Sequence, residues 1–466
     1  MKILRHYIPG SFLLLLIVES CILMLAPAMG LQLSAMFGLG TVHHITLDWW
    51  WPRATIFTVI SISAMTFMGL YWRHRKESEL VDFVVRGSIS FIIGIAMISL
   101  VFYAFPTLSV DRSVMFFTVL VSLALMSLIR LMHYQISDHH ASRSRVLVVG
   151  TGKKAELIHK LKRKSDLYGT KIVGYVYIAG EHSFVPEEKT ITLNGALIDY
   201  IHEHQIEEIV VAVDDRRKSF PVDEILECKM DGLEVYEAGD FIERQIKKIR
   251  LDTLHPSSMI FSDGYTRAVL DSLSKRIFDI AASLMLLVIA APVMIITALS
   301  IWMESGFKGT LIYRQERVGK NGKLFNVLKF RSMKEDAEKG GVAQWAQKDD
   351  DRVTANGKVI RMLRIDELPQ LFNVLRGDMS FVGPRPERPQ FVEQLSQVIP
   401  FYNLRHYVKP GITGWAQICY PYGASEQDAI EKLQYDLFYI KRYSIMFDMV
   451  ILFQTAQAVL WARGGR

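Results

Sequence analysis

Cysteine is scarce in this chain of 466 residues: it has only Cys21, Cys228 and Cys419, which lie far apart. Three widely spaced cysteines exclude a disulfide scaffold and match no zinc-ligand spacing, so a reducing environment is the default for the aqueous part. Charged residues are also few, at 22%, while half of the residues are hydrophobic. This composition excludes a disordered chain and a collagen-like fibre. It indicates membrane and aqueous parts joined in series, in roughly two to four domains.

Four long apolar runs occur near the N-terminus, at residues 11–29, 55–72, 87–105 and 114–133. Each is close to the ~20 residues that a membrane-spanning helix needs. The first run could be a cleaved signal peptide, but its length and the three further runs favour a retained helix. Glu19 lies inside this run, and we expect it to face the other helices in a structural polar contact, because a carboxylate is costly in lipid.

The cations are unevenly distributed over the segments that join these runs. Lysine and arginine are concentrated before the first run, after the second and after the fourth, and the formal net charge is +6. The positive-inside rule therefore predicts that the N-terminus and everything after the fourth helix are cytoplasmic. The excess of positive charge favours anionic partners, which include phosphates, acidic lipid surfaces and nucleic acid.

The spacing of hydrophobic residues along the chain changes at Arg145, from long apolar runs to short ones. Buried strands are predicted at RVLVVG, KIVGYVY, EIVVAV and LEVYEA, and they alternate with helical segments, which indicates an α/β domain with a parallel sheet. Gly150, Gly152 and Ala155 match a loose form of the dinucleotide fingerprint, but no acidic residue ends the second strand. We favour a Rossmann-like fold without a cofactor over a nucleotide site. The absence of a YxxxK pair weakens the alternative of an NAD-dependent nucleotide-sugar dehydratase or epimerase with a membrane anchor.

A fifth apolar run covers residues 277–303 and contains Pro292 near its middle. Proline removes one backbone hydrogen bond and kinks a helix. Cations flank both ends of the run, so charge gives no preference for crossing the membrane. A broken helix that enters one leaflet and returns, and a kinked helix that spans the membrane, agree equally well with the residues of this run.

Two adjacent carboxylates, Asp366 and Glu367, begin a predicted helix of about ten residues. Asp366 is the expected N-cap, Pro369 lies in the first turn and Gly377 follows the last turn. Neighbouring positions on a helix point about 100° apart, so the two carboxylates can serve as a nucleophile and a base. The alternative is an ordinary helix cap.

Basic residues surround this pair in the sequence. They occur at 314–322 and 325–333, at Arg361 and Arg364, and in the Gly-Pro-Arg-Pro turn that presents Arg385. Such cations could bind phosphate, could face an acidic leaflet, or could form a solvated surface. Residues 405–417 form another loop rich in proline and glycine, and residues 438–460 form an amphipathic stretch that lies in the membrane interface or packs on the domain.

Three ordered motifs occur in the C-terminal third: KFRSM, IDELPQLFNVLRGDMSFVGPRPE and KPGITGWAQ. Together they resemble the bacterial sugar transferase family, the monotopic polyprenyl-phosphate phosphoglycosyl transferases. The whole chain is similar to the large members that prime O-antigen and exopolysaccharide synthesis. This resemblance implies a membrane α-helical bundle at 1–140, a Rossmann-like α/β domain at 141–270, and an α-rich α/β catalytic domain at 271–466 with a re-entrant membrane helix at 277–303.

The resemblance also implies the activity, which is transfer of a sugar 1-phosphate from a UDP-sugar to undecaprenyl phosphate with release of UMP. Asp366 matches the family's nucleophile, which forms a phosphosugar intermediate, and Glu367 matches the second member of the dyad, a base. Mg²⁺ is the implied cofactor and would bind near Asp366. Phosphate contacts are expected from five basic residues: Lys329, Arg331, Arg361, Arg364 and Arg385.

Family members break the re-entrant helix at a Ser-Pro pair, which here is Ala291-Pro292. The role of the missing serine would pass to Ser283 or to water. The catalytic domain would then lie on the cytoplasmic face of the bacterial inner membrane. The implied partners are the lipid bilayer and a second copy of the chain, with no nucleic acid. The sugar cannot be read from the motifs, although the large members suggest glucose or galactose. A regulatory scaffold with an inactive transferase domain is the other alternative.

Overall fold

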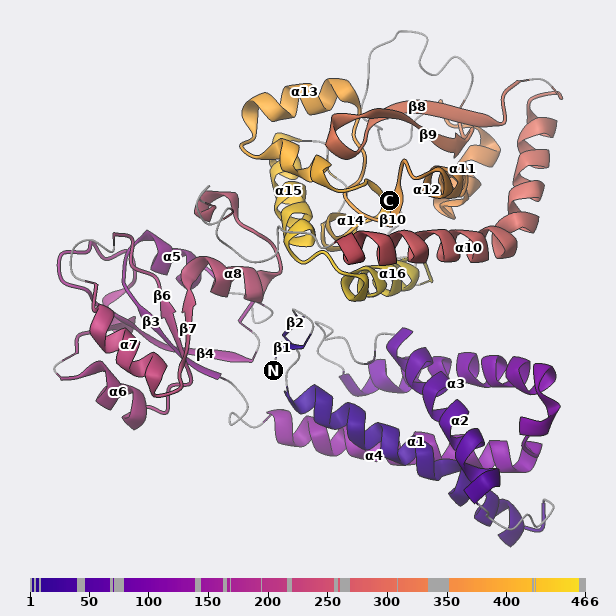
Figure 1. Ribbon diagram of the computed structural model, residues 1–466, viewed down its shortest axis with the longest axis horizontal. Helices are drawn as coiled ribbons and strands as arrows, with labels where there is room; N and C mark the ends of the chain where they lie inside the picture. Colours follow the sequence, from indigo (N-terminus) through magenta and orange to yellow (C-terminus); the bar gives the residue numbers. More distant parts are fainter. Residues whose placement is uncertain are drawn as a thin grey trace. The chain divides into compact units, whose positions relative to one another are not determined.

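The structure is a computed structural model that describes residues 2–3, 6–7, 10–39, 47–67, 70, 79–138, 144–161, 166–167, 169–193, 195–215, 220–254, 259, 269–307, 309–333, 352–420, 423 and 425–460. It divides into two compact units, Met1–Arg143 and Ser144–Arg466 (Figure 1). The second unit contains an α/β part and a C-terminal domain.

The N-terminal unit contains the four predicted apolar helices, α1 (Gly10–Met36), α2 (Leu47–Phe67), α3 (Glu79–Ala104) and α4 (Arg112–Asp138). Strands β1 (Lys2–Ile3) and β2 (His6–Tyr7) form a small antiparallel pair before them. Buried side chains from the four helices pack together, including Leu23, Met65, Ile98 and Met126. Among the described residues of this unit, Leu14–Met36, Gly87–Ala104 and Arg112–Met132 are long and apolar enough to cross a membrane.

Glu19 faces the interior of this helical unit, as predicted. Its carboxylate is fully buried and forms a two-point ion pair with Arg130, with Nε–Oε1 at 2.6 Å and Nη2–Oε2 at 3.0 Å. Arg130 also donates a hydrogen bond to the carbonyl oxygen of Leu70. The costly charge is thus paired by a guanidinium fork, which is the structural polar contact that the sequence indicated.

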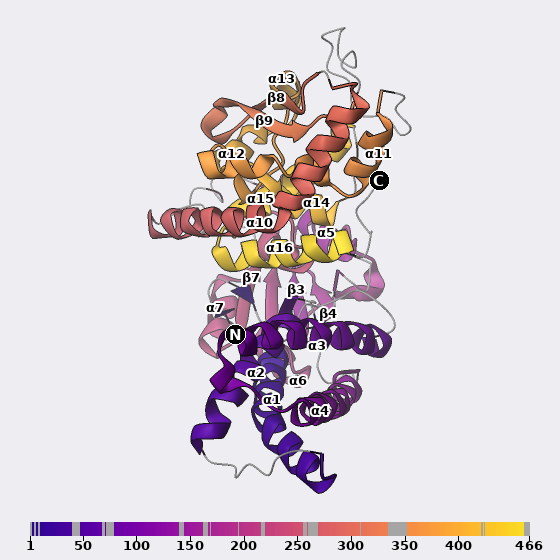
Figure 2. The ribbon, with the colours of Figure 1, turned by 90° about the vertical axis from the view of Figure 1, so that its right-hand side faces the viewer.

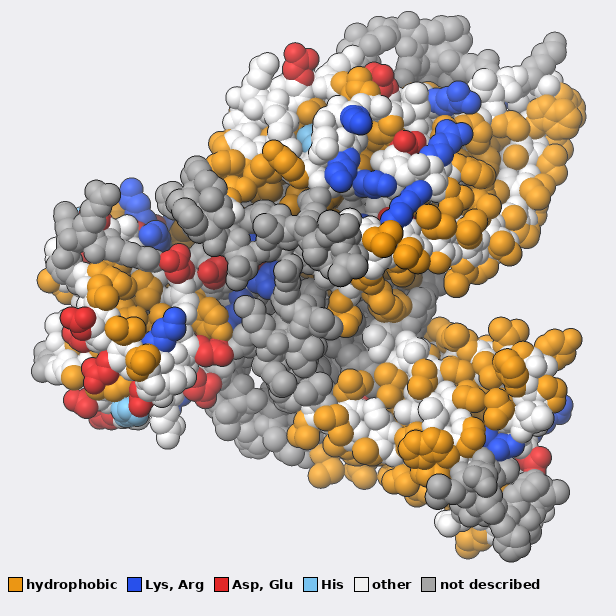
Figure 3. All heavy atoms as spheres, in the orientation of Figure 1, with side chains coloured by type: hydrophobic (Ala, Val, Ile, Leu, Met, Phe, Trp, Pro, Cys, Tyr) orange, Lys and Arg blue, Asp and Glu red, His pale blue; other side chains and the backbone are white. Residues whose placement is uncertain are grey.

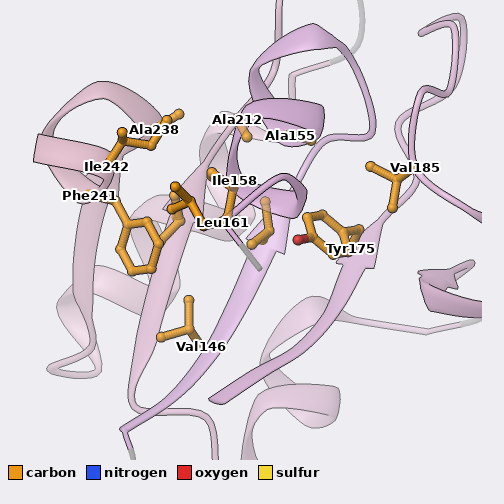
Figure 4. Packing of buried hydrophobic residues seen from close by; sticks show 12 residues of the cluster. Val146, Ala155, Ile158, Leu161, Tyr175, Val185, Ala212, Ala238, Phe241 and Ile242 are labelled. Atoms are coloured by element: carbon orange, nitrogen blue, oxygen red, sulfur yellow. The ribbon is translucent and has the colours of Figure 1, made fainter. Parts of the chain in front are cut away.

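The α/β part is a five-stranded parallel sheet with the strand order β5-β4-β3-β6-β7. The strands are β3 (Ser144–Val149), β4 (Thr170–Val176), β5 (Thr190–Ile191), β6 (Glu208–Val211) and β7 (Glu234–Glu237). Helices α5 (Lys153–His159) and α8 (Ala238–Ile246) cover one face, where Ile158, Tyr175 and Phe241 are buried together (Figure 4). Helices α6 (Leu197–Glu203) and α7 (Val222–Met230) cover the other face. The predicted parallel α/β region is confirmed.

The C-terminal domain surrounds two small sheets. Strands β8 (Ile312–Val318) and β9 (Leu324–Phe330) form a hairpin, and β10 (Ser380–Val382) pairs in parallel with β11 (Gly411–Thr413). The surrounding helices are α10 (Val269–Glu304), α11 (Ala355–Met362), α12 (Gln370–Arg376), α13 (Pro389–Val398), α14 (Trp415–Cys419), α15 (Glu426–Lys441) and α16 (Ile445–Leu460). Short 3₁₀ turns η6 (Ile365–Glu367) and η7 (Tyr402–Tyr407) join them.

The amphipathic stretch at 438–460 comprises the end of α15 and all of α16. The chain leaves the helix between Lys441 and Ile445. Ser444 then accepts a hydrogen bond from the backbone N–H of Phe447, which caps the start of α16. Arg442, which follows the last residue of α15, donates hydrogen bonds to the carboxylate of Glu243 in α8.

The first part of α10 is bound to the core of the C-terminal domain. Arg276 donates hydrogen bonds to the carbonyl oxygens of Val374 (2.6 Å) and Leu375 (2.7 Å), at the end of α12. One turn further on, the buried carboxylate of Asp279 accepts a hydrogen bond from Ser380 at 3.0 Å. These bonds fix the beginning of α10 against α12 and β10.

The last part of α10 contacts the same domain through α11. The side chain of Asn356 donates to the carbonyl oxygen of Ser300 at 3.1 Å, and its backbone N–H donates to Glu304 at 3.1 Å. Figures 1 and 2 show that α10 changes direction along its length, and Pro292 lies inside it. The described stretch Ser272–Glu304 is long and apolar enough to cross a membrane, yet both of its ends contact one domain.

Ser283 does not take over the role of the serine that is missing before Pro292. It is fully buried, and its hydroxyl has no hydrogen-bond partner among the residues that the structure describes. The reason is positional. Pro292 frees the carbonyl oxygen of the residue four positions earlier, Val288, whereas a serine in a helix reaches only carbonyl oxygens in the turn before it.

Candidate active site

Strand β9 and helix α12 form the frame of the site. Asn373 is fully buried in α12, and its side-chain oxygen accepts a hydrogen bond from the backbone N–H of Leu328 at 3.0 Å. Its side-chain nitrogen donates to the carbonyl oxygen of Asn326 at 2.8 Å. One amide side chain therefore satisfies two backbone groups of β9. This contact holds Lys329, the next residue of the strand, beside the turn that precedes α12.

The two carboxylates lie in that turn, η6, and not at the start of a ten-residue helix. Asp366 is not the N-cap of α12, because this helix begins at Gln370 and its N-cap is Pro369. The carbonyl oxygen of Ile365 accepts a hydrogen bond from the N–H of Leu368 at 3.1 Å, so the residues before Gln370 form a 3₁₀ turn, with bonds between residues three apart. The helix is therefore shorter than predicted. Its predicted end is confirmed, since Gly377 adopts a left-handed φ of 95°.

Glu367 is held by two cations. Its Oε1 atom lies 3.2 Å from Lys329 Nζ and 3.2 Å from Arg385 Nη2. Its side chain is only 13% exposed. Burial alone would raise the pKa of Glu367, but the charges of Arg385, Lys329 and Arg364 outweigh burial and lower the pKa to about 2. Glu367 is therefore ionised throughout the physiological pH range.

The pKa of the adjacent residue, Asp366, is shifted in the opposite direction. Burial raises its pKa, and the negative charge of Glu367 raises it further, against the charges of Lys329, Arg361 and Arg385. No hydrogen bond or ion pair joins its carboxylate to the residues that the structure describes. The two neighbouring carboxylates thus have pKa values shifted in opposite directions, a pattern that in enzymes accompanies different chemical roles.

The turn that carries Arg385 is fixed by backbone contacts. The N–H of Gly383 donates to Thr413 at 2.9 Å, and the N–H of Gly411 donates to Pro384 at 3.0 Å. A Cβ atom on Gly383 would lie 2.4 Å from the carbonyl oxygen of Lys409, so only glycine allows this close approach. The result is a rigid turn whose arginine reaches Glu367.

The other predicted basic residues, Arg331, Arg361 and Arg364, differ in how they relate to the two carboxylates. Arg361, on α11, acts electrostatically on Asp366, and Arg364 acts on Glu367. Arg364 directly precedes η6, as its N-cap, with a left-handed φ of 57°. Arg331 follows β9 and its backbone N–H donates to Leu311, but its contact with phosphate remains a prediction. Lysine and arginine side chains gather on the face of this domain seen in Figure 3, beside the hydrophobic surface of α10.

The donor set at Asp366 suits Mg²⁺. This ion keeps several waters and is bound through one or two carboxylates together with substrate phosphates. Within the described residues there is no group of three or more His, Cys, Asp or Glu side chains that could hold a metal ion. A single carboxylate with no protein partner among them, flanked by cations that also attract phosphate, is compatible with an ion held jointly by protein and substrate.

The glycine-rich turn of the α/β part binds carboxylates of the chain itself. Glu181 accepts a hydrogen bond from the N–H of Thr151 at 2.8 Å, and Asp214 accepts from the N–H of Lys153 at 2.7 Å. Glu181 also accepts from the N–H of Asp214 at 2.9 Å. In dinucleotide-binding folds such N–H groups bind the pyrophosphate. A nucleotide could bind this turn only if both side chains moved away.

Sequence reasoning did not identify Asn373, Arg405 or Asp436 as parts of the site. Arg405 is buried, donates to the carbonyl oxygen of Arg385 at 3.0 Å and forms an ion pair with Asp436 at 2.9 Å. Asn373 lies within a motif quoted above and Arg405 begins the loop at 405–417, but no spacing rule indicates their partners. Asp436 lies in α15 and has no sequence signal at all.

Comparison with known proteins places the chain in a family. The family model described as "Bacterial sugar transferase" matches residues 270–462. A protein of Caulobacter vibrioides named UDP-glucose:undecaprenyl-phosphate glucose-1-phosphate transferase is 39% identical over 212 residues, which cover 44% of this chain and 78% of that protein. The chain belongs to the bacterial sugar transferase family.

Two other relatives extend the match. UDP-N-acetylgalactosamine-undecaprenyl-phosphate N-acetylgalactosaminephosphotransferase of Aeromonas hydrophila is 42% identical over 239 residues, 51% of this chain and 55% of the relative. UDP-glucose:undecaprenyl-phosphate glucose-1-phosphate transferase of Xanthomonas campestris pv. campestris is 30% identical over 323 residues, 68% of this chain and 66% of the relative. The match to the Aeromonas protein thus spans about half of its length.

Proposed function

We propose that the chain transfers a sugar 1-phosphate from a UDP-sugar to undecaprenyl phosphate, and so forms undecaprenyl-diphospho-sugar and UMP. The observation that carries this proposal is the Asp366–Glu367 pair, whose pKa values are shifted in opposite directions by burial and by a shared set of cations. The names of the family relatives support the lipid acceptor and the phosphotransferase chemistry.

Asp366 is the proposed nucleophile. One oxygen of its carboxylate attacks the β-phosphorus of the UDP-sugar, and the bond from that phosphorus to the bridging oxygen breaks, so that UMP leaves. An acyl phosphate between Asp366 and the sugar phosphate remains. A phosphate oxygen of undecaprenyl phosphate then attacks the same phosphorus and releases the carboxylate. The cations Lys329, Arg361 and Arg385 stabilise the charge on the transferring group.

Glu367 has a more specific part than the resemblance implies. With a pKa of about 2, it is a poor base near pH 7, because a base works best when its pKa is close to the operating pH. In the structure it pairs with Lys329 and Arg385. We propose that incoming phosphates draw these two cations away, which raises the pKa of Glu367 and makes it available as the base of the second step.

Helix α10 is proposed to enter the membrane and return on the same side. Arg276 at one end and Ser300 at the other both bond to the C-terminal domain. Contacts of both ends with one domain support a helix that returns to the side from which it entered. The middle of α10 exposes apolar side chains, including Val288 and Ile289, which suit contact with lipid. The catalytic domain would then lie on the cytoplasmic face of the inner membrane.

Several further features are part of the same proposal. Asp366 would hold Mg²⁺, which when bound would neutralise developing negative charge on the phosphates. The domain division at 1–140, 141–270 and 271–466, the Rossmann-like character of the middle domain and a homodimer are also proposed. The proposed sugar is glucose, galactose or N-acetylgalactosamine, because relatives with the first and third of these sugars in their names match this chain and the large family members that the chain resembles suggest galactose as well.

The test is UMP release by the purified full chain from a panel of UDP-sugars with Mg²⁺, with and without undecaprenyl phosphate. We expect continuous UMP release with one sugar when the lipid is present. Without the lipid, UMP release should stop at no more than one equivalent. Absence of UMP with every sugar and with the lipid would contradict the proposed function.

A further inference from the structure

A buried arginine contacts the turn that carries Arg385. Arg405 lies in η7, and its side chain is 6% exposed. Its guanidinium donates to three oxygen atoms: Tyr402 Oη at 2.7 Å, the carbonyl oxygen of Arg385 at 3.0 Å and Asp436 Oδ2 at 2.9 Å. Each of these bonds has a different direction, which only a planar fork of donors can satisfy at once.

Asp436 supplies the charge that makes this burial tolerable. Its carboxylate, in α15, is 2% exposed. A buried guanidinium without a paired carboxylate would be strongly destabilising, whereas a paired and fully hydrogen-bonded one is not. Asp436 therefore fixes Arg405, and Arg405 in turn fixes the backbone of Arg385.

The bond to the carbonyl oxygen of Arg385 acts on the residue that contacts Glu367. Arg385 Nη2 lies 3.2 Å from Glu367 Oε1, and its direction depends on the turn from which it projects. The carbonyl oxygen of the next residue, Pro386, is also held, by Arg317 at 3.2 Å. A buried donor, Arg405, and a partly buried one, Arg317, thus bind two consecutive carbonyl oxygens of the turn, and neither is among the described contacts of Asp366 or Glu367.

We propose that Arg405 and Asp436 are positioning residues that hold the turn at residues 383–387 so that the guanidinium of Arg385 faces Glu367 and the phosphates of the substrate. Neither residue touches the reacting atoms. The kinetic part of this proposal rests on the proposed function, whereas the part that concerns the turn itself does not.

The kinetic test uses Arg405→Lys and Asp436→Asn, each made alone and in an Arg385→Ala background. The measurement is single-turnover UMP release with enzyme in excess, which resolves slow variants. With Arg385 present, each change should slow release by at least about tenfold, because a misplacement of about 1 Å can cost ~100-fold. In the Arg385→Ala background each should have less than about a twofold effect, because residues that act through one another are not additive.

A matched control separates positioning from general loosening of α15. Ser425 and Asp428 form a capping box at the start of this helix, so Ser425→Ala weakens α15 without touching Arg405. This control should change the rate by the same small factor in both backgrounds. If Arg405→Lys and Asp436→Asn also act by equal factors in both backgrounds, their role is merely structural and the proposal is overturned.

A second measurement does not depend on activity. Hydrogen exchange followed by mass spectrometry reports the N–H groups of Gly383 and Gly411, which are bonded across the turn. Peptides that cover residues 380–388 and 408–414 should exchange faster in Arg405→Lys and Asp436→Asn than in the unaltered chain, while peptides of β9 stay unchanged. Unchanged exchange in the turn overturns the proposal, whatever the rates. If no UDP-sugar is a donor, the proposed function fails, and exchange still decides whether Arg405 fixes the turn.

Discussion

Replacing Glu367 by glutamine tests how strongly the two cations bind this carboxylate. The folded protein lowers the pKa of Glu367 from 4.5 to about 2. Each pKa unit corresponds to about 1.4 kcal/mol, so the ionised side chain is favoured in the folded state by roughly 3 kcal/mol. Its side chain is 13% exposed, so solvent screens little of this energy. Glutamine keeps the size but not the charge, and should lose stability of that order at neutral pH.

The pH dependence of this loss has a definite sign. Because the folded pKa lies below the unfolded value of 4.5, the stabilisation is fully present above about pH 5 and disappears as the pH falls toward 2. The difference between the unaltered chain and Glu367→Gln should therefore be constant from about pH 5.5 to 8 and should narrow in acid.

Thermal unfolding of the purified protein measures this effect. A loss of ~3 kcal/mol in a domain of this size lowers the midpoint temperature by roughly 6–12 °C. Glu393→Gln, at an exposed position of α13 in the same domain, is the matched control and should change stability by less than about 0.5 kcal/mol. Equal midpoints for Glu367→Gln and the unaltered chain at pH 7.5, or a difference that persists in acid, would show that Lys329 and Arg385 do not stabilise the Glu367 carboxylate.

Arg361 lowers the pKa of Asp366 against the effect of burial. In Arg361→Ala, the fall in the rate of single-turnover UMP release at acidic pH should therefore begin at a higher pH than in the unaltered chain; a fall that begins at the same or a lower pH would contradict this electrostatic role. Asn373→Ala leaves two backbone groups of β9 without their partners, and should cost about 2–4 kcal/mol in thermal unfolding; a loss below about 0.5 kcal/mol would show that Asn373 does not hold β9. Pro292→Ala should favour a straight α10, detected by labelling single cysteines in the C-terminal domain from each side of the membrane, with Ala291→Ser as the control; identical labelling in both variants would show that Pro292 does not determine the bend.

The sequence predicts the features that depend on local pattern. The four N-terminal helices follow from long apolar runs, and the inward direction of Glu19 follows from the cost of a charge in lipid. The parallel sheet follows from the alternation of buried strands and helices. The proximity of Lys329, Arg385 and Glu367 follows from motifs of a family whose members share a site.

Other features depend on contacts between distant segments, which no local pattern reports. Arg405 meets Asp436 across 31 residues, and Glu181 reaches the N–H of Thr151 across 30 residues. Only the folded chain brings these groups together. The predicted cap at Asp366 is wrong for a different reason: the residues before Gln370 form a 3₁₀ turn, which the sequence pattern does not distinguish from the first turn of an α-helix.

Asp366 is proposed to carry the sugar phosphate between the two steps. This role is tested by mass spectrometry of the acid-quenched protein after incubation with its UDP-sugar and Mg²⁺, without undecaprenyl phosphate. We expect an added mass of one sugar phosphate on the peptide that contains Asp366, its removal when undecaprenyl phosphate is added before the quench, and its absence in Asp366→Asn. UMP formation that requires the lipid from the outset, with no adduct on the protein, would contradict it.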